Sequence, residues 1–515
     1  VGFHDYLVAG SQVVVKAYCG DRCDSRQHIT VPYIYSSATT LTGQGSIATT
    51  AMLYVKSGTL TISGNIEVAE VIVCPGAELK INSGATLTAQ KVVLRTRSLK
   101  DTYYPSAVLT NNGTLSCTQF YYSRITTDKQ NTYQIGFPLD VTIDKTATNT
   151  VLSRGSRAII GSHFALMEYD SQSRAANGKG GNWKTVDAAT VKKMDRRSSY
   201  QYLSTSAYYQ EVLFPATYDK ASTTGSQSIS VTAYTAQSAL EANVGWNYIV
   251  SPFTTVYRPV ISDPADALKI CVLTEDNHSY WQHPVTELEP AMPFYYQALS
   301  DGQLDFTLDG SLLKRVQRQT VNPAQTTQWI EVAVERADAV SQRTDAVHIY
   351  LSPVRFTDDY ERGYDMVKLT KEGTEPLIYA SLQCGDLAFA ALPDSTAMRG
   401  LPLTVFNPEA ERITFYLPQT DYTDRLEAVY LYDRQENRVI DLLKNDYTVW
   451  LVKTTTTDRF LLYAKFKEEE EHTTTDVNQT EDTSKDTIKV QKVFIDQNVF
   501  IIRDGKTYSI LGAEM

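Results

Sequence analysis

The chain has 515 residues, which exceeds what one hydrophobic core accommodates and predicts several domains of ~100–200 residues each. Hydrophobic residues make up 42% of it, as in a globular protein, and the formal net charge of -11 disfavours nucleic acid as a partner. No apolar run reaches the roughly 18 residues of a membrane span. The opening VGFHDYLVAG lacks the zones of a signal peptide, so we expect a removed signal or the C-terminal part of a longer chain.

Cysteine usage is sparse. Cys19 and Cys23 are close enough in sequence to close a small loop, and this pair is a candidate disulfide. Two close cysteines without a second pair do not make a zinc site, which needs four ligands, so we expect no metal there. The remaining cysteines lie in separate apolar stretches and are expected to be buried small hydrophobes: Cys74, Cys117, Cys271 and Cys384.

Composition indicates an all-β protein, because the chain is rich in Tyr (33 residues), Thr and Val and has almost no helical periodicity. An imperfect repeat appears in residues 51–117 when the glycines are aligned: VKSGTLTISGNIEVAE, VCPGAELKINSGATLTAQ and, after an insertion, TNNGTLSCTQF. Gly58 and Gly76 recur at nearly the same interval as Gly64 and Gly84. This period fits the coils of a short parallel β-solenoid over residues 1–128, with apolar side chains stacked coil on coil. The alternative is a run of hairpins in a sandwich.

Residues 129–318 show a different sequence pattern, without the glycine repeat. NTYQIGFPLDV and GWNYIVSPFTTV each predict an apolar strand ending near a proline, whose missing N–H stops the hydrogen-bond ladder. Between them, HFALMEYDSQSRAANGKGGNWKTV predicts a strand, a polar Gly-rich loop and then Trp183. This pattern predicts a β-sandwich or barrel.

Residues 319–467 predict short strands separated by turns, as in an immunoglobulin-like β-sandwich. Residues 468–489, EEEEHTTTDVNQTEDTSKDTIK, are acidic, Thr-rich and nearly devoid of apolar side chains, so we expect a disordered, solvated linker. Residues 490–515 then predict a C-terminal hairpin, with Asp504 and Gly505 in the turn. A hairpin of this kind is marginal alone. It pairs either with another protein or with the preceding sandwich.

Motifs for catalysis are absent: the sequence has no GxSxG, HExxH or P-loop. The acidic residues Asp358, Asp359, Glu361 and Asp365 could hold calcium, but they lack the spacing of a known loop, so a solvated loop is favoured. Exposed aromatic residues are the possible ligand signal, because aromatic faces stack on sugars or anchor protein partners. The candidates, of which alternation places at least half in the core, are Tyr280, Trp281, Phe294, Tyr295 and Tyr296.

Several stretches, in one consistent order, resemble a known class of protein. They are YDSQSRAANGKGGNW (169–183), GWNYIVSPF (245–253), DDYERGYDMVKL (358–369), LAFAALP (387–393), VYLYDRQENRVIDLLKNDYTVWLV, DRFLLYAKF and the final FIIRDGKTYSILG. Together they make the chain similar to the C-terminal half of large cell-surface proteins of Bacteroidetes that are exported by the type IX secretion system. The usual sorting domain carries a YDxxGR-like segment, whose place RDGKTYSILG takes here.

The resemblance implies a protein secreted to the outer surface of a Gram-negative bacterium, with the type IX translocon and shuttle as partners. It also implies O-glycosylation at Asp-(Ser/Thr)-small-or-apolar sites, for which DST and DTI make Ser395 and Thr487 the candidates. The sorting signal would be the C-terminal tail, and its candidate residues are Phe500, Ile502, Asp504, Gly505, Lys506, Tyr508 and Gly512.

Three functions remain open. The favoured one is a non-enzymatic structural or adhesive surface protein, of S-layer or adhesin type, acting by self-association or attachment. A carbohydrate-binding accessory protein would instead use the aromatic residues 280–296. A solenoid polysaccharide-degrading enzyme would need converging charged residues, whereas the repeat supplies only Glu67, Glu70 and Glu78 at positions that do not recur. No cofactor is expected.

Overall fold

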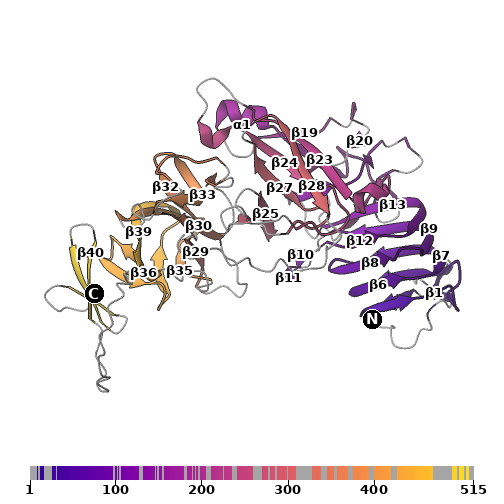
Figure 1. The fold of residues 1–515 in the computed structure, drawn as a ribbon, viewed down its shortest axis with the longest axis horizontal. Helices are drawn as coiled ribbons and strands as arrows, with labels where there is room; N and C mark the ends of the chain where they lie inside the picture. Colours follow the sequence, from indigo (N-terminus) through magenta and orange to yellow (C-terminus); the bar gives the residue numbers. More distant parts are fainter. Residues whose placement is uncertain are drawn as a thin grey trace, which may run out of the picture.

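The computed structural model is mostly β-structure, as the composition predicts, and α1 (Ser171–Asn177) is the α-helix among the described residues. Figure 1 places the first strands at one end of the long axis and the last strands at the other. The described residues are 9, 12–16, 26–30, 32–96, 99–100, 102–103, 106–126, 132–144, 146–147, 150–153, 156–178, 182–187, 189–191, 193–194, 198–204, 210–223, 225–234, 240–258, 270–276, 279–284, 287–298, 300–308, 328–337, 345–352, 356–362, 364–368, 375–393, 399–418, 426–467, 490–495, 498–503 and 506–509.

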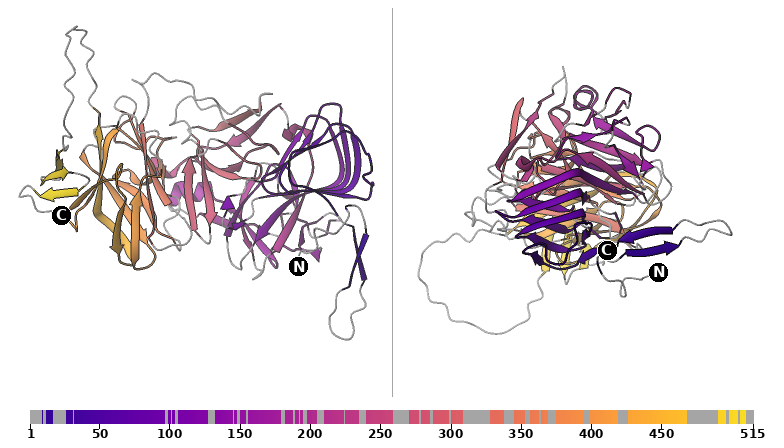
Figure 2. Two further views of the ribbon diagram at one scale, coloured as in Figure 1. Left: turned by 90° about the horizontal axis from the view of Figure 1, so that it is seen from below. Right: turned by 90° about the vertical axis from the view of Figure 1, so that its right-hand side faces the viewer.

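The first part of the chain alternates between two parallel sheets, which together we call the parallel stack (Figure 2). Leu60 pairs with Leu79 in one sheet and Val71 with Val92 in the other, and these four side chains are fully buried. One sheet contains β3 (Tyr33–Tyr35), β5 (Met52–Val55), β7 (Asn65–Val73), β9 (Thr86–Arg95) and β13 (Thr114–Thr126); the other contains β4 (Thr39–Leu41), β6 (Gly58–Ile62), β8 (Ala77–Ile81) and β12 (Val108–Asn111). Two hairpins accompany them: β1 (Gln12–Lys16) with β2 (Arg26–Thr30), and β10 (Leu99–Lys100) with β11 (Thr102–Tyr103).

Residues that pair between adjacent coils are separated by one residue more in the sequence than the corresponding glycines are. Gly58 lies opposite Ala77, one position beyond Gly76, and Asn65 lies opposite Thr86. The difference arises because Gly76 turns the chain just before β8, with φ of 77°, whereas Gly58 is itself the first residue of β6. Glycines mark the turns but do not occupy equivalent rungs.

Gly64 packs directly against the chain segment before it in the parallel stack. A Cβ atom at this position would lie 1.9 Å from the carbonyl oxygen of Thr42, a backbone atom that cannot rotate away. We therefore expect Gly64→Ala to lower the free energy of unfolding by ~1–3 kcal/mol in urea denaturation. Gly43→Ala is the matched control, because nothing lies within 4 Å of its Cβ position. Equal losses in the two variants would contradict this close packing.

Strand β13 connects the parallel strands β3, β5, β7 and β9 to an antiparallel part of the same sheet. Its first part pairs with β9 in parallel, and its second part pairs with β22 in antiparallel fashion. The continuation consists of β22 (Gln210–Ala216), β15 (Val141–Thr142), β16 (Leu152–Ser153), β17 (Ser156–Arg157) and β20 (Lys193–Met194).

A second large sheet, which we call the middle sheet, follows. It contains β14 (Thr132–Phe137), β18 (Phe164–Tyr169), β19 (Trp183–Thr185), β21 (Ser198–Ser204), β24 (Trp246–Val250), β25 (Ile270–Asp276), β26 (Ser279–Pro284) and β27 (Pro293–Gln297). The pair β23 (Gly225–Val231) and β28 (Gly302–Leu308) lies against it, and two short 3-10 helices, η1 (Lys220–Thr223) and η2 (Glu241–Asn243), lie between strands.

Helix α1 replaces the first part of the polar Gly-rich loop expected between β18 and Trp183, and residues 179–181 lie outside the described residues. The Asp170 side chain caps the helix by accepting a hydrogen bond from the Ser173 N–H at 2.9 Å. Gly178 ends it in the left-handed conformation, where its N–H donates to the Arg174 carbonyl. The sequence therefore contained both cap signals around a short helix.

The C-terminal sheet has 11 strands among the described residues, and all its pairs are antiparallel except β30 with β33. Its strands are β29 (Gln328–Arg336), β30 (Asp345–Leu351), β31 (Met366–Val367), β32 (Leu377–Leu382), β33 (Gly385–Leu392), β34 (Leu401–Asn407), β35 (Glu411–Tyr416), β36 (Leu426–Asp433), β37 (Arg438–Asp441), β38 (Tyr447–Leu451) and β39 (Thr454–Phe466).

The expected C-terminal hairpin has one strand more than predicted. β40 (Val490–Ile495), β41 (Asn498–Arg503) and β42 (Lys506–Ser509) form a three-stranded antiparallel sheet, which we call the tail sheet. Arg503 pairs with Lys506, so residues 504 and 505 connect β41 to β42. The third strand arises because VQKVFI supplies a complementary partner for NVFIIR. The expected linker, 468–489, lies outside the described residues.

Alternation along β24 and β27 sends side chains to two different hydrophobic cores. Trp246, Tyr248 and Tyr295 join the large cluster of the C-terminal sheet. Ile249 and Phe294 join a smaller cluster formed with β23 and β28. A further cluster runs from the parallel stack into β14, β18, β21 and β22. In the part of the chain that the structure covers, no helix has both the length and the apolar character needed to cross a membrane.

Candidate functional site

The aromatic residues proposed as ligand contacts lie on two strands of the middle sheet. Tyr280 and Trp281 are on β26, opposite Glu275 and Thr274, and their side chains lie outside the described part of the structure. Phe294 is 0% exposed and Tyr295 is 2% exposed, so neither ring offers a face to a ligand. Tyr296 is partly buried against the small core. The most exposed described tryptophan is Trp450, at 59%, on β38.

The remaining candidate residues fall mostly outside the described residues. Phe500 and Ile502 lie on β41, and Lys506 and Tyr508 lie on β42. Of the cysteines, Cys74 is buried, and Cys117 and Cys384 are partly buried, all as free thiols. The candidates for which the structure gives no description are Cys19, Cys23, Ser395, Thr487, Asp504, Gly505 and Gly512.

Three of the stretches that carry the resemblance meet between the middle sheet and the C-terminal sheet, a region that we call the module junction. The rings of Tyr169 and Trp183 are 5.2 Å apart, and Trp183 lies 5.3 Å from Tyr248. Tyr360, from the third stretch, packs against the same hydrophobic cluster. Residues far apart in sequence thus form one aromatic contact region.

Polar contacts fix the loop of residues 357–365 against the middle sheet. The Tyr360 hydroxyl donates to Gln297 Oε1 at 3.0 Å, and Gln297 Nε2 donates to the carbonyls of Glu241 and Val244 at 3.0 and 2.9 Å. Arg362 Nε lies 2.6 Å from Glu241 Oε2. These directional hydrogen bonds fix the position and orientation of the loop more closely than apolar packing alone would.

Asp365 corrects the expectation of a solvated acidic loop. It is 2% exposed, and its two carboxylate oxygens accept hydrogen bonds from the N–H groups of Ala391 and Glu361 at 2.7 and 2.8 Å. Burial raises its pKa to about 7, and the two hydrogen bonds oppose that shift. Asp358 instead pairs with Arg399 at the surface, at 3.2 Å. Within the described ranges, no group of three or more acidic, His or Cys side chains is placed to hold a metal.

The module junction also encloses polar groups that lack partners. Arg174 on α1 is 2% exposed, and its Nε has no hydrogen-bond partner. The Tyr169 hydroxyl is likewise shielded and without a partner. Burial raises the pKa of Tyr169 to about 12, although the Arg174 charge opposes this, so the phenol is neutral at physiological pH.

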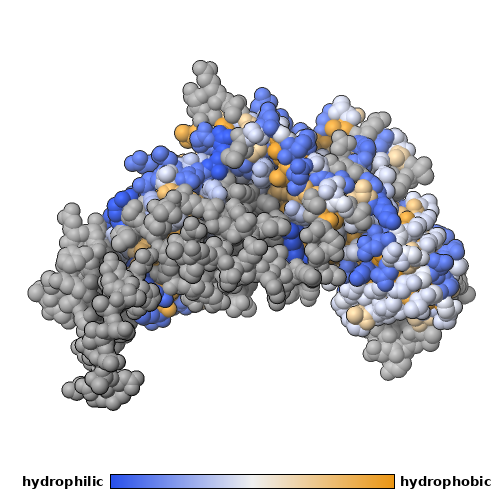
Figure 3. All heavy atoms as spheres, in the orientation of Figure 1, coloured by the Kyte–Doolittle hydropathy of each residue, from blue (hydrophilic) through white to orange (hydrophobic). Residues whose placement is uncertain are grey.

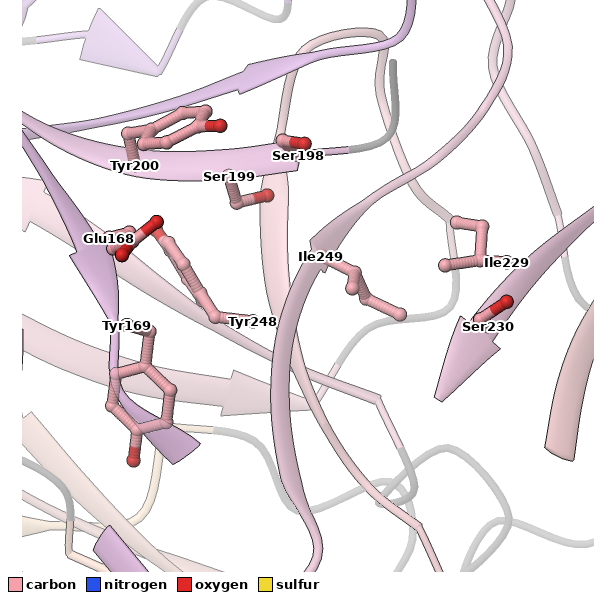
Figure 4. Close-up of a pocket in the computed structure, with 9 residues that line it drawn as sticks. All are labelled: Glu168, Tyr169, Ser198, Ser199, Tyr200, Ile229, Ser230, Tyr248 and Ile249. Carbon is pink, nitrogen blue, oxygen red and sulfur yellow. The ribbon is translucent and has the colours of Figure 1, made fainter. Parts of the chain in front are cut away.

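A hollow of about 410 Å³, which Tyr169 also lines, lies where strands of the middle sheet diverge (Figure 4). β18 pairs with β21 only as far as Glu168 and Tyr200, and β21 then meets β24 at a single bridge, Ser198 to Ile249. The hollow lies where this pairing ends, and β23 lines it from outside the middle sheet. Its lining consists of Glu168, Tyr169, Ser198, Ser199, Tyr200, Ile229, Ser230, Tyr248 and Ile249.

Sequence reasoning did not single out the lining of the hollow. Its residues come from four strands, and SSYQYLS reads like any strand with polar and aromatic alternation. A signal was present only in the serine pair Ser198 and Ser199 at a strand start, which a turn explains equally well.

Comparison of the chain with models of known protein families, with curated proteins and with solved structures finds no match.

Proposed function

We propose that this protein is a non-enzymatic structural or adhesive component of the outer cell surface. In this proposal the parallel stack is a short parallel β-solenoid, the middle sheet with β23 and β28 is a β-sandwich, and the C-terminal sheet is an immunoglobulin-like sandwich. Delivery to the surface would use type IX secretion, through residues 490–515.

The observation that carries the proposal is the shared core at the module junction. Trp246 and Tyr295 of the middle sheet belong to one cluster with Val332, Ile349 and Phe389 of the C-terminal sheet. Domains joined by a flexible linker make few contacts across their boundary and move relative to each other. A shared core with directional hydrogen bonds instead makes an elongated rigid body, which suits a spacer or a lattice unit.

The surface is compatible with a role at an aqueous cell boundary. On the face drawn in Figure 3, hydrophilic residues predominate over the described part of the surface, and apolar residues are scattered among them. Among the described residues, the exposed large hydrophobic side chains lie at three separate places in the chain: Ile34; Tyr234 and Leu240; and Trp450 and Val452.

Electron cryotomography of the native host tests the proposal. We expect the protein, marked by an antibody, in regular arrays or filaments on the outer surface, and loss of these arrays when its gene is deleted. A monomer dispersed in the periplasm or cytoplasm would contradict the proposal.

Truncation after Lys467 tests the role of the tail. Among the described residues, the tail strands hydrogen-bond only to each other, although β42 lies near β37. We expect the truncated protein to keep its thermal midpoint and to lose surface display in the native host. A much earlier melting transition would show that the tail completes the C-terminal sandwich, because each buried apolar side chain contributes ~1.5–3 kcal/mol.

A further inference from the structure

The hollow between β18, β21, β23 and β24 contains a buried hydroxyl group that the fold does not use. Ser199 is 6% exposed, and its Oγ makes no hydrogen bond within the protein. A buried hydroxyl without a partner destabilises a fold, and such groups are few in native structures. In Figure 4 the Ser199 side chain projects from β21 toward the side on which Tyr248 and Ile249 lie.

The other lining groups define the chemistry that fits. Tyr248 is held in place because its hydroxyl donates to Gln134 Oε1 and its ring packs against Tyr295 and Trp183, so the part of the ring that borders the hollow is a fixed apolar wall. Ser198 and Ser230 add hydroxyls nearer the rim, and Ser230 Oγ, which accepts from Gln303 Nε2 at 2.9 Å, keeps its own proton to donate. Small-ligand sites combine apolar and aromatic walls with a few polar groups in a comparable volume.

Glu168 sets the charge that the hollow accepts. It is exposed at the rim and is the one acidic or basic side chain among the lining residues that the structure describes. Its carboxylate accepts hydrogen bonds from hydroxyl groups and repels anions. A ligand rich in hydroxyls, without negative charge and with one apolar face meets all these conditions.

We propose that the hollow binds a neutral pyranose unit of a glycan, with Ser199 Oγ and Glu168 as its hydrogen-bonding partners and the Tyr248 ring as its apolar wall. The argument uses only the residues of the hollow and stands independently of the structural role proposed above. The site differs from the aromatic candidates on β26 and β27.

Calorimetric titration of the full chain with glucose, galactose, mannose, N-acetylglucosamine and xylose tests this proposal. At least one sugar should bind at millimolar concentration or below, and glucuronic acid should bind more weakly than glucose. Ser199→Ala should weaken binding about fivefold and Glu168→Gln about tenfold or more. Because Ser199 Oγ has no protein partner, its removal should leave the thermal midpoint unchanged or raise it.

Ser123→Ala is the matched control, because Ser123 Oγ is also buried and without a partner but lies on β13, away from the hollow. It should leave sugar binding unchanged. The proposal is overturned if none of the sugars binds at millimolar concentration, if Ser199→Ala and Glu168→Gln bind as the native protein does, or if glucuronic acid binds best.

Discussion

Replacing Trp246 by alanine should lower the free energy of unfolding by ~3–5 kcal/mol, one of the two largest effects we expect for a single substitution. The Trp246 ring is 0% exposed, its Nε1–H donates to the Ala242 carbonyl at 2.9 Å, and it packs edge-on against Tyr295. Its loss leaves a cavity in the core shared by the middle and C-terminal sheets. Calorimetry should therefore show a lower midpoint and a transition that separates into two.

Trp450→Ala provides the control for Trp246→Ala, because the same side chain is removed from a site that is 59% exposed. We expect a change within about 1 kcal/mol and a single transition. If Trp246→Ala behaved like Trp450→Ala, the module junction would not couple the two sheets, and the rigid-body proposal would lose its main support.

Lys368→Met should also lower the free energy of unfolding, by ~3–5 kcal/mol at neutral pH. Lys368 Nζ binds the carboxylate of Asp345, and the two side chains are 1% and 2% exposed. Asp345 also accepts a hydrogen bond from the Ile378 N–H at 2.7 Å. Methionine keeps an unbranched side chain only one heavy atom shorter than lysine, so the loss comes mainly from an uncompensated buried carboxylate. Chemical denaturation measures it.

The stability loss of Lys368→Met should depend on pH, and the pKa of Asp345 determines the direction of that dependence. Burial raises the pKa of Asp345 above 3.8, and Lys368 opposes that rise, so the variant's carboxyl should have a still higher pKa. A buried acid with a raised pKa is stable when protonated and loses that stability as pH rises through its folded pKa. The defect of Lys368→Met should therefore shrink as pH is lowered toward 4.

Two further variants check this interpretation. Asp345→Asn combined with Lys368→Met should recover much of the stability, because the amide oxygen can still accept from Ile378 and no charge remains buried. Lys465→Met, which breaks an exposed pair with Glu427 at 2.7 Å, should change stability by no more than about 1 kcal/mol. Equal losses from Lys465→Met and Lys368→Met would contradict the role of burial.

The local elements of the fold were more predictable than their assembly. Alternating Leu and Ile side chains in residues 58–62 and 77–81 predicted strands that stack, and Leu60 does pair with Leu79. β14 ends at Phe137, immediately before Pro138, as the missing N–H requires. Helix α1 was missed because its polar face dominates a short segment, and the cap residues Asp170 and Gly178 resemble loop residues.

The candidate sites were less predictable, because they depend on contacts between distant segments. Asp365 follows acidic neighbours and reads as solvated, but β33 supplies the Ala391 N–H that binds its carboxylate. Phe294 and Tyr296 share one face by alternation, yet nothing in the sequence shows that β23 and β28 cover that face. The hollow arises from divergence of β18 and β24 along β21, which leaves no mark in any single stretch.

Because of strand β13, local unfolding of the parallel stack should start from one end only. Among the described strands of its sheet, the order runs from β3, which pairs with β5 alone, through β5, β7 and β9 to β13, which also pairs with β22. In a linear array of this kind each strand is stabilised mainly by its nearest neighbours. Fraying therefore proceeds from β3 inward and stops at β13, so amide hydrogens at the N-terminal edge exchange with solvent first while those of β13 persist longest.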